Sequence, residues 1–356
     1  MRTELLDYDL PRDRIALRPL AERDAARLLV LGARGIEHRA VRDLVELVPS
    51  DSLLVVNDTR VLRARLLGQR QPSGGKVEIL LLEREGAAGA REHWQALGRA
   101  SKPLRAGTRI TAGDIEIEVL GNDAQGTLRV LVRAEPDTEA ALERHGHVPI
   151  PPYLEREDDA EDVDRYQTIY ARHAGSVAAP TAGLHFSDAL LSRLRDRGVE
   201  MGRVTLHVGL GTFRPVMVEE LDQHVMHHER LHVSTDLCEQ VARVRARGGR
   251  VVAVGTTVVR ALESAHDEAR PGQILPRDGQ TNLFIRPGYR FGVVDALLTN
   301  FHMPTSTLLA LVSAFAGLER LRDAYAVALA EGYRFLSYGD AMWIPERSGA
   351  SDRASE

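Results

Sequence analysis

The chain has 356 residues and 44% hydrophobic content, which is enough for about two domains with buried cores. No run of about 18 apolar residues occurs, and the N-terminal MRTELLDYDLPRDR lacks the apolar segment of a secretory signal, so we expect a cytoplasmic protein without membrane contact. The net charge of −5 excludes a uniformly basic, nucleic-acid-coating chain but leaves room for a local basic patch.

The basic residues and the single cysteine narrow the chemistry. Nearly all basic residues are arginines, the only lysines being Lys76 and Lys102, and arginine suits bidentate phosphate contacts and base stacking. A bias in nucleotide composition explains the same excess, because alanine is also abundant. With Cys238 alone, the chain can form neither an internal disulfide nor a CxxC-type zinc or iron–sulfur site.

In chain order, residues 1–67 predict strands such as RLLVL and SLLVVN around one helix, VRDLVELV. From residue 68 to 149, short alternating segments such as KVEILLLE and TRITAGDIEIEVL are separated by glycine-rich turns, which is typical of a small antiparallel β barrel or sandwich. Residues 149–166 join a proline-rich stretch to an acidic run and indicate a solvated linker or loop.

After this linker, helical segments such as SDALLSRLRDRG alternate with strands such as VEMGRVTLHV and RVVAVG, and NLFIRPGYRF is also strand-like. Alternation of this kind is typical of an α/β core. We therefore predict a mixed α/β main domain formed by residues 1–67 and 150–345. The small antiparallel β barrel or sandwich would be a domain inserted at residues 68–149, and residues 346–356 would form a flexible tail.

Three motifs match in letters but lack the context that their chemistry requires. His228, Glu229 and His232 spell HExxH, yet a strand or loop fits the flanking residues as well as a helix does, and no third ligand follows. GLGTF (209–213) lacks the third glycine of a dinucleotide-binding fingerprint. GGKV (74–77) lacks the spacing of a P-loop. The sequence thus favours a polar site without a metal.

Two glycine-containing segments favour ligand contacts through the backbone. Gly255, Thr256 and Thr257 lie between a strand and an amphipathic helix, where free N–H groups bind carboxylate or phosphate. N-capping by threonine explains the same residues. In GSVAAPTAGLHF, small residues lead to His185 and let the backbone approach a flat ligand, with a tight internal packing turn as the alternative.

The segment VVDALLTNFHMP (293–304) carries polar residues on an apolar strand. Asp295, Asn300 and His302 interrupt an otherwise apolar run that leads into a proline-started helix. Capping of that helix does not explain a histidine and an asparagine at this position. Polar groups at the end of a strand are typical of a site, so we expect these three residues to contribute to a pocket.

Together, these segments closely resemble the S-adenosylmethionine:tRNA ribosyltransferase-isomerases of queuosine biosynthesis, in the family's order along the whole chain. The matching stretches are NDTRVLRARL (57–66), GHVPIPPYLER (146–156), YQTIYARHAGSVAAPTAGLHF (166–186), VTLHVGLGTFRPV (204–216), MHHE (226–229), VAVGTTVVRALES (252–264), LFIRPGYRFGVVDALLTNFHMPTSTLLALVSAFAG (283–317) and YRFLSYGDAMWI (333–344). Departures occur at Arg63, Arg286 and Thr305, where the family usually has proline, an aromatic residue and a charged residue. The family's MHHE pattern requires only His227 and Glu229, so the HExxH match is accidental.

The resemblance implies a small antiparallel β-barrel domain inserted in the larger α/β domain, and it also implies an activity and its partners. The enzyme would transfer and isomerise the ribosyl group of S-adenosylmethionine onto 7-aminomethyl-7-deazaguanine at the tRNA anticodon wobble position, giving epoxyqueuosine-tRNA, adenine and methionine. The substrates would be tRNAs with a GUN anticodon, those for aspartate, asparagine, histidine and tyrosine. S-adenosylmethionine would be consumed as a substrate, without a metal or other cofactor, by a monomer.

In that reaction the sulfonium acidifies the neighbouring 5′ protons, so a base is needed, and adenine must receive a proton or hydrogen bond as it leaves. The candidates for these transfers, not assigned individually, are Asp295, His185, His302 and His207. The candidates for substrate recognition are Gly255, Thr256 and Thr257 for the methionine carboxylate; Ala179, Pro180, Thr181, Ala182 and Gly183 for the nucleoside; Asn300 beside them; Arg60, Arg165 and Arg260 for anions; and Tyr166 and Tyr153 for stacking on anticodon bases.

Two other classes of protein remain open. A non-catalytic RNA-binding protein would use the β-rich block as an oligonucleotide-binding barrel. An ordinary methyltransferase would release S-adenosylhomocysteine instead of adenine and methionine.

Overall fold

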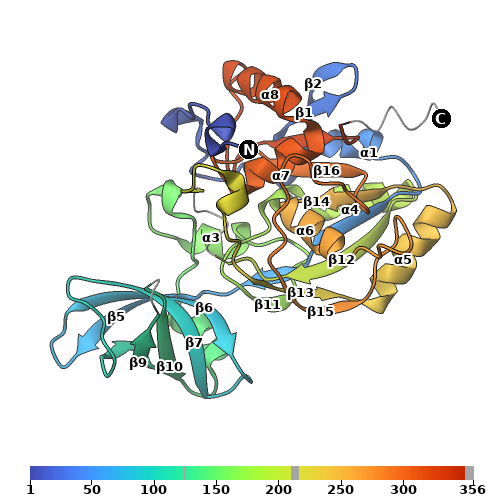
Figure 1. Cartoon of the computed structure of the whole chain (residues 1–356). Helices are drawn as coiled ribbons and strands as arrows, with labels where there is room; N and C mark the ends of the chain where they lie inside the picture. Colours follow the sequence, from blue (N-terminus) through green and yellow to red (C-terminus); the bar gives the residue numbers. More distant parts are fainter. Residues whose placement is uncertain (124–125, 210–215, 349–356) are drawn as a thin grey trace. The chain divides into compact units, whose positions relative to one another are not determined.

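A large mixed sheet and a closed barrel account for the two domains expected from the chain length. The computed structural model describes residues 1–123, 126–209 and 216–348 (Figure 1). One unit comprises Met1–Thr59, Thr168–Arg172 and Pro180–Glu356, and the other comprises Arg60–Gln167 and His173–Ala179. The expected tail at residues 346–356 falls largely outside the described residues.

The second unit extends beyond the expected insertion at residues 68–149, so those boundaries are too narrow. Arg60 forms ion pairs with Glu139 and Glu143, and the Gln167 amide bonds the backbone N–H and carbonyl of Val61. These contacts join both ends of the segment to the second unit. The change to short alternating segments at residue 68 therefore lies inside the second unit and not at its boundary.

The second unit is built around a closed antiparallel barrel, which confirms the predicted barrel. Its strands, in spatial order, are β10 (Leu128–Arg133), β7 (Arg91–Ala100), β6 (Lys76–Glu85), β5 (Arg65–Gln71), β8 (Arg109–Ala112) and β9 (Ile115–Asn122). Alternate residues of β7 are buried, as expected for a strand with one face in a barrel interior. The remaining elements are β4 (Thr59–Val61) paired with β11 (His173–Ser176), α2 (Thr138–His145), η5 (Pro152–Leu154) and α3 (Ala160–Arg165).

The first unit contains a nine-stranded mixed sheet. Its strands, in spatial order, are β15 (Arg277–Thr281), β13 (Glu229–Val233), β12 (Glu200–Leu206), β3 (Leu53–Asn57), β14 (Val251–Val254), β16 (Ala296–Asn300), β17 (Ala341–Ile344), β1 (Arg27–Gly32) and β2 (Gly35–Ala40). The neighbours from β12 to β16 are parallel. Every residue of β3, β14 and β16 is buried, because helices and loops cover both faces of these strands.

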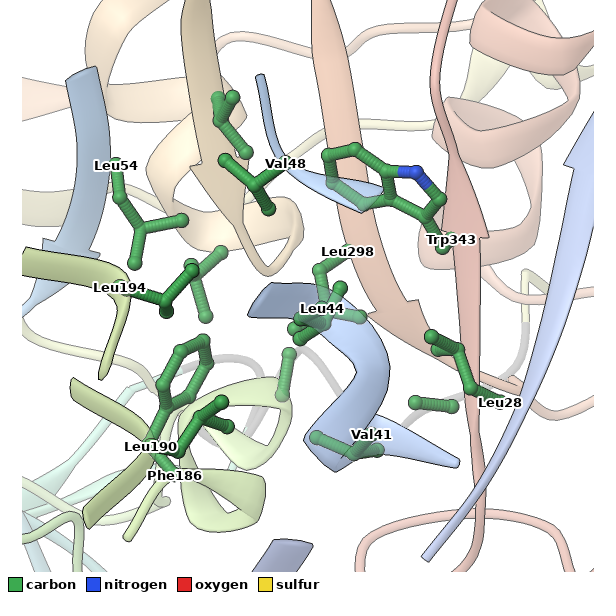
Figure 2. Close-up of a cluster of buried hydrophobic side chains, with 14 of the residues drawn as sticks. Leu28, Val41, Leu44, Val48, Leu54, Phe186, Leu190, Leu194, Leu298 and Trp343 are labelled. Atoms are coloured by element: carbon green, nitrogen blue, oxygen red, sulfur yellow. The ribbon is translucent and has the colours of Figure 1, made fainter. Parts of the chain in front are cut away.

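Helices cover the two faces of this sheet. On one face, α1, α4 and the turn η6 enclose the hydrophobic cluster that Figure 2 shows, with Leu44, Leu194 and Phe186 packed towards Leu54 and Leu298. On the other face, α5 and α6 pack against β12 and β3. The helical elements of this unit are η1 (Thr3–Leu6), η2 (Arg12–Arg14), η3 (Arg23–Ala25), η4 (Val41–Asp43), α1 (Leu44–Leu47), η6 (Thr181–His185), α4 (Asp188–Asp196), η8 (Leu221–Gln223), α5 (Thr235–Ala246), α6 (Thr256–Ser264), α7 (Thr307–Ala316) and α8 (Leu318–Ala330).

Local sequence explains where several of these elements begin. Ser187, Ser234 and Ser306 precede α4, α5 and α7, and each hydroxyl accepts a bond from the third backbone N–H of its helix. The strand-like segment NLFIRPGYRF is irregular instead, and the edge strand β15 ends just before it. None of the helices in the described part of the chain is long and apolar enough to cross a membrane.

Glu263, in the last turn of α6, holds the segment that leads into β16. It is 5% exposed. One carboxylate oxygen accepts the N–H groups of Val293 and Val294, each at 3.0 Å, and the other accepts the N–H of Gly292 at 2.8 Å. A carboxylate is needed here, because three donors converge on it.

We expect Glu263→Gln to lower the free energy of unfolding by about 1–3 kcal/mol, since the amide leaves the N–H of Gly292 without an acceptor. Urea unfolding followed by Trp343 fluorescence in a Trp94→Phe background tests this, because the chain has only two tryptophans and Trp343 is buried in the first unit. The exposed Glu268→Gln is the matched control. Equal urea midpoints for the two variants would contradict the proposed role.

Candidate functional site

The carboxyl ends of four parallel strands in the first unit meet at one edge of the sheet. β12, β3, β14 and β16 end at Leu206, Asn57, Val254 and Asn300. Open α/β sheets bind ligands at this edge, because side chains and helix N-termini that follow the strands converge there. Most of the predicted site residues of the first unit lie at or next to these four strand ends.

Asn57 connects two of these strand ends. Its Nδ2 donates to the Leu206 carbonyl at 2.9 Å, and its Oδ1 accepts the N–H groups of Leu206 at 3.0 Å and Thr59 at 3.2 Å. Nδ2 also lies 3.4 Å from the Thr257 hydroxyl. The side chain is 1% exposed, so it fixes the backbone at the edge and does not face solvent.

His207 follows β12 directly and contacts the end of β3. Its Nδ1 lies 2.8 Å from the Thr59 hydroxyl, and its backbone N–H donates to the Arg230 carbonyl at 3.0 Å. The residue is half-buried, unlike His185 and His302, which are 5% and 7% exposed. His207 is therefore the most accessible of the three predicted acid–base histidines.

The N-terminus of α6 lies beside the turn η6, so the structure brings these two predicted segments together. Gly255 precedes the helix with φ of 90°, and its N–H donates to the Leu298 carbonyl at 2.8 Å. A Cβ on Gly255 would lie 3.5 Å from that of Ala182 in η6. Thr256 and Thr257 are 6% and 8% exposed.

Asn300 holds η6 against the end of β16. Its Oδ1 accepts the Thr181 hydroxyl at 3.0 Å, and its Nδ2 donates to the Leu336 carbonyl at 3.1 Å and to His185 Nε2 at 3.2 Å. A carbonyl can only accept, so the NH₂ group must face Leu336, and His185 Nε2 must then accept as well. The His185 proton is thereby placed on Nδ1.

Burial lowers the pKa of His185 to about 4, with a further lowering from Arg334 and an opposing effect of Asp340. Burial alone lowers the pKa of His302 to about 3. His302 Nε2 lies 2.7 Å from the Thr299 hydroxyl, and its backbone N–H donates to the Tyr325 hydroxyl at 2.9 Å. Both histidines are thus neutral at pH 7.

Asp295 does not join this group, and the expectation that it lies at the same strand end is wrong. It precedes β16, about 16 Å along the strand from Asn300. Its carboxylate accepts Arg245 Nη1 at 2.6 Å and the N–H of Val251 at 2.8 Å. These bonds join the amino ends of two strands to α5, which is a stabilising role.

Arg260 forms a buried ion pair with Glu229, and each of these side chains is 6% exposed. Arg260 Nε donates to the Leu283 carbonyl at 3.0 Å, and a Glu229 oxygen accepts the N–H of Gly209 at 3.1 Å. Arg260 Nη2 has no hydrogen-bond partner among the described residues. Nη2 is therefore a buried donor that the described residues leave unsatisfied.

Glu229 is also the first residue of β13. His228 therefore lies just before this strand and His232 lies on it, so the two histidines do not share one helical face. His232 Nδ1 lies 3.5 Å from Asp278. The described residues contain no cluster of three or more ligating side chains with the geometry of a metal site. Of GLGTF, only Gly209 lies within the described residues.

Gly183 supports the alternative interpretation of GSVAAPTAGLHF as a tight packing turn. A Cβ on Gly183 would lie 2.2 Å from the Tyr170 hydroxyl oxygen and 2.8 Å from the Thr168 methyl group. Ala179 is 4% exposed and Pro180 is also buried. Gly183 is therefore required by internal packing, whatever ligand the turn contacts.

Several predicted recognition residues belong to the second unit, where they already have partners. Arg60 is neutralised by Glu139 and Glu143, and Arg165 lies 3.7 Å from Glu161. Tyr166 is 1% exposed, so, contrary to expectation, its ring offers no free face for stacking on an anticodon base. The half-buried Tyr153 retains an accessible edge.

Three further residues belong to this edge and were not predicted from the sequence: Asn57, Thr59 and Asp340. Asp340 precedes β17 and is 2% exposed, accepting the N–H groups of Arg27 at 3.0 Å and Arg334 at 2.8 Å. An acidic residue directly before the apolar AMWI was the available signal for Asp340. No local signal shows that Asn57 would reach a neighbouring strand.

The neutral histidines predict a pH dependence of stability. Their folded-state pKa values lie below the ordinary 6.5, so the unfolded chain binds more protons between pH 6.5 and about 4, and stability falls as pH falls through that window. At pH 5 we expect each histidine to account for a loss of roughly 2 kcal/mol relative to pH 7. The test is urea titration at pH 7 and pH 5. In His302→Gln the decrease in unfolding free energy between the two pH values should be smaller by the contribution of one histidine, and in the exposed His228→Gln it should be unchanged. The same acid sensitivity in all three proteins would contradict the assignment.

Comparisons with known proteins agree along nearly the whole chain. A family model described as queuosine biosynthesis protein matches residues 3–344. A protein of Sorangium cellulosum named S-adenosylmethionine:tRNA ribosyltransferase-isomerase is 53% identical, covering 97% of this chain and 98% of that protein. One of Xanthomonas oryzae pv. oryzae with the same name is 54% identical, covering 98% of each.

A solved structure supports the same conclusion. The crystal structure of an S-adenosylmethionine tRNA ribosyltransferase from Thermotoga maritima is 34% identical and superposes with a TM-score of 0.53, covering 96% of this chain and 99% of that one. The mixed α/β sheet with a separate closed barrel is therefore shared with a relative of known structure. The chain belongs to the queuosine biosynthesis protein family.

Proposed function

We propose that the chain transfers and isomerises the ribosyl group of S-adenosylmethionine onto 7-aminomethyl-7-deazaguanine at the wobble position of tRNA, releasing adenine and methionine. The observation that carries this proposal is the convergence of His207, His185 and the α6 N-terminus at one sheet edge, in a chain 53% identical to an enzyme with that name. We further propose tRNAs with a GUN anticodon as substrates, a monomeric and cytoplasmic enzyme, and no metal or other cofactor.

We propose His207 as the group that accepts the 5′ proton. It is half-buried at the carboxyl edge, and Thr59 orients its ring through Nδ1. A general base must reach the proton it removes, and His207 is more accessible than His185 or His302. The lowered pKa values of those two residues make them weak bases but suit them to neutral hydrogen-bonding roles near the leaving purine.

The N-terminus of α6 is the proposed site of the methionine carboxylate. The backbone N–H groups of Thr256 and Thr257 follow a buried strand, and the positive end of the helix dipole favours an anion there. The N–H of Gly255 is bonded to the Leu298 carbonyl, so Gly255 contributes the turn that exposes the helix end. Arg260 Nη2 adds an unsatisfied donor one helical turn further on. The nucleoside would then lie towards η6, since Ala182 packs beside Gly255.

Adenine release from S-adenosylmethionine in the presence of substrate tRNA tests the proposal. We expect His207→Gln to reduce kcat by about 10²- to 10⁴-fold, the usual loss for a true acid or base. The exposed His228→Gln should keep wild-type activity. Full activity of His207→Gln would remove this residue from the mechanism.

The products also separate the other classes of protein. Release of S-adenosylhomocysteine instead of adenine and methionine would indicate a methyltransferase. Binding of tRNA without any adenine release from the wild-type chain would indicate a non-catalytic RNA-binding protein.

A further inference from the structure

A groove of about 400 Å³ lies between α4 and the first half of β12, entirely within the first unit. Its walls combine five apolar side chains with arginine, glutamate and glutamine. The lining residues are Leu54, Leu191, Leu194, Arg195, Gly198, Val199, Glu200, Met201, Arg203 and Gln240. The volume lies within the range of small-ligand sites.

The groove exists because β12 has a strand on one side only along its first half. β3 pairs with Glu200–Val204, whereas the register with β13 covers Thr205 and Leu206. The edge of β12 near Arg203 therefore has no neighbouring strand among the described residues. Glu200, Met201 and Arg203 are only partly buried there, beside the apolar residues of α4.

Arg203 is the central polar group of the groove. Its Nε is buried and has no hydrogen-bond partner among the described residues. Burial lowers the pKa of Arg203, and the nearby Arg172 lowers it further, while Asp58 acts in the opposite direction. A guanidinium held partly desolvated beside a second cation is stabilised when an anion binds to it.

The remaining charges of the groove also favour an anion. Arg195 is exposed on the groove wall. Glu200, the one acidic lining residue, is already paired with Arg247 at 2.7 Å and lies 3.9 Å from Arg243. The two lining arginines are therefore not balanced by the lining carboxylate.

We propose that this groove binds a phosphate-bearing nucleotide of an RNA strand, with the phosphate on Arg203 and Arg195 and the flat base over the apolar residues of α4 and β12. Arginine matches this chemistry, since its planar fork bonds phosphate through two N–H groups and its face stacks on bases. The inference deepens the proposed function and rests on it, because it takes tRNA as the substrate.

The position of the groove assigns it to a nucleotide other than the reacting one. Arg203 precedes His207 by four residues along the extended chain of β12. Its backbone therefore lies about 13 Å from His207, the proposed general base. The wobble base must reach His207 and the α6 N-terminus. The groove thus holds the chain at a flanking position and does not contact the atoms that react.

Binding of a fluorescein-labelled RNA hairpin with a GUN anticodon loop, measured by anisotropy without S-adenosylmethionine, tests the proposal. We expect Arg203→Gln to weaken binding about tenfold and to reduce the slope of log K against log salt by about 0.7, the value for one phosphate contact on a single strand. The KM for tRNA should rise to a similar extent, with kcat and the affinity for S-adenosylmethionine within about twofold of wild type.

Two further variants control the experiment. Arg195→Gln alters an exposed side chain on the same wall, so it tests the groove without risk to folding, and we expect a weaker but similar effect. Arg193→Gln lies on α4 outside the groove and should bind as the wild type does. Hairpin affinity and salt slope unchanged in both Arg203→Gln and Arg195→Gln would overturn the proposal.

Guanosine 5′-monophosphate serves as the free-nucleotide probe. If Arg203→Gln abolished binding of this probe but left hairpin binding unchanged, the occupant would be a free nucleotide, and the RNA assignment would be wrong. Hairpin binding does not depend on turnover. A wild-type chain that binds the hairpin through Arg203 but releases no adenine would refute the proposed function while supporting the groove.

Discussion

The carboxyl edge of the sheet depends on two buried asparagine side chains that satisfy backbone groups where parallel strands end. Asn57 bonds the backbone of Leu206 and Thr59, and Asn300 bonds the Leu336 carbonyl, Thr181 and His185. An amide can donate and accept at once, so each asparagine joins segments far apart in the sequence. Leaving such buried groups unsatisfied costs about 1–3 kcal/mol each, which makes the edge rigid.

One residue at this edge has a strained backbone conformation. Leu336 has φ of 71°, an uncommon conformation for a branched residue, and in it the Leu336 carbonyl accepts Asn300 Nδ2. The asparagine can then present its second N–H to His185. Strain at one residue thereby sets the tautomer of another, and the histidine is held neutral as a hydrogen-bonding group.

The arginines of the chain differ in whether the fold places a carboxylate beside them. Arg260 and Arg245 are paired with Glu229 and Asp295 and connect secondary structure elements. Arg203, in contrast, lies in a groove whose acidic residue is bonded elsewhere. The distinction cannot be made from the frequency of arginine, because it depends on which carboxylates the fold brings near each guanidinium.

The sequence by itself determined the class of fold, the antiparallel β-rich domain and the family, since alternation, strand length and motif order are local properties of the chain. It also placed Gly255, Thr256, Thr257 and Asn300 at strand ends, because apolar runs and caps mark where strands and helices begin and end. Tertiary structure alone decided which ends meet. Asp295 and Asn300 are five residues apart in sequence but at opposite edges of the sheet, whereas His207 and Thr59 touch across 148 positions. Strand direction and pairing order, which no single segment encodes, separate the first pair and join the second.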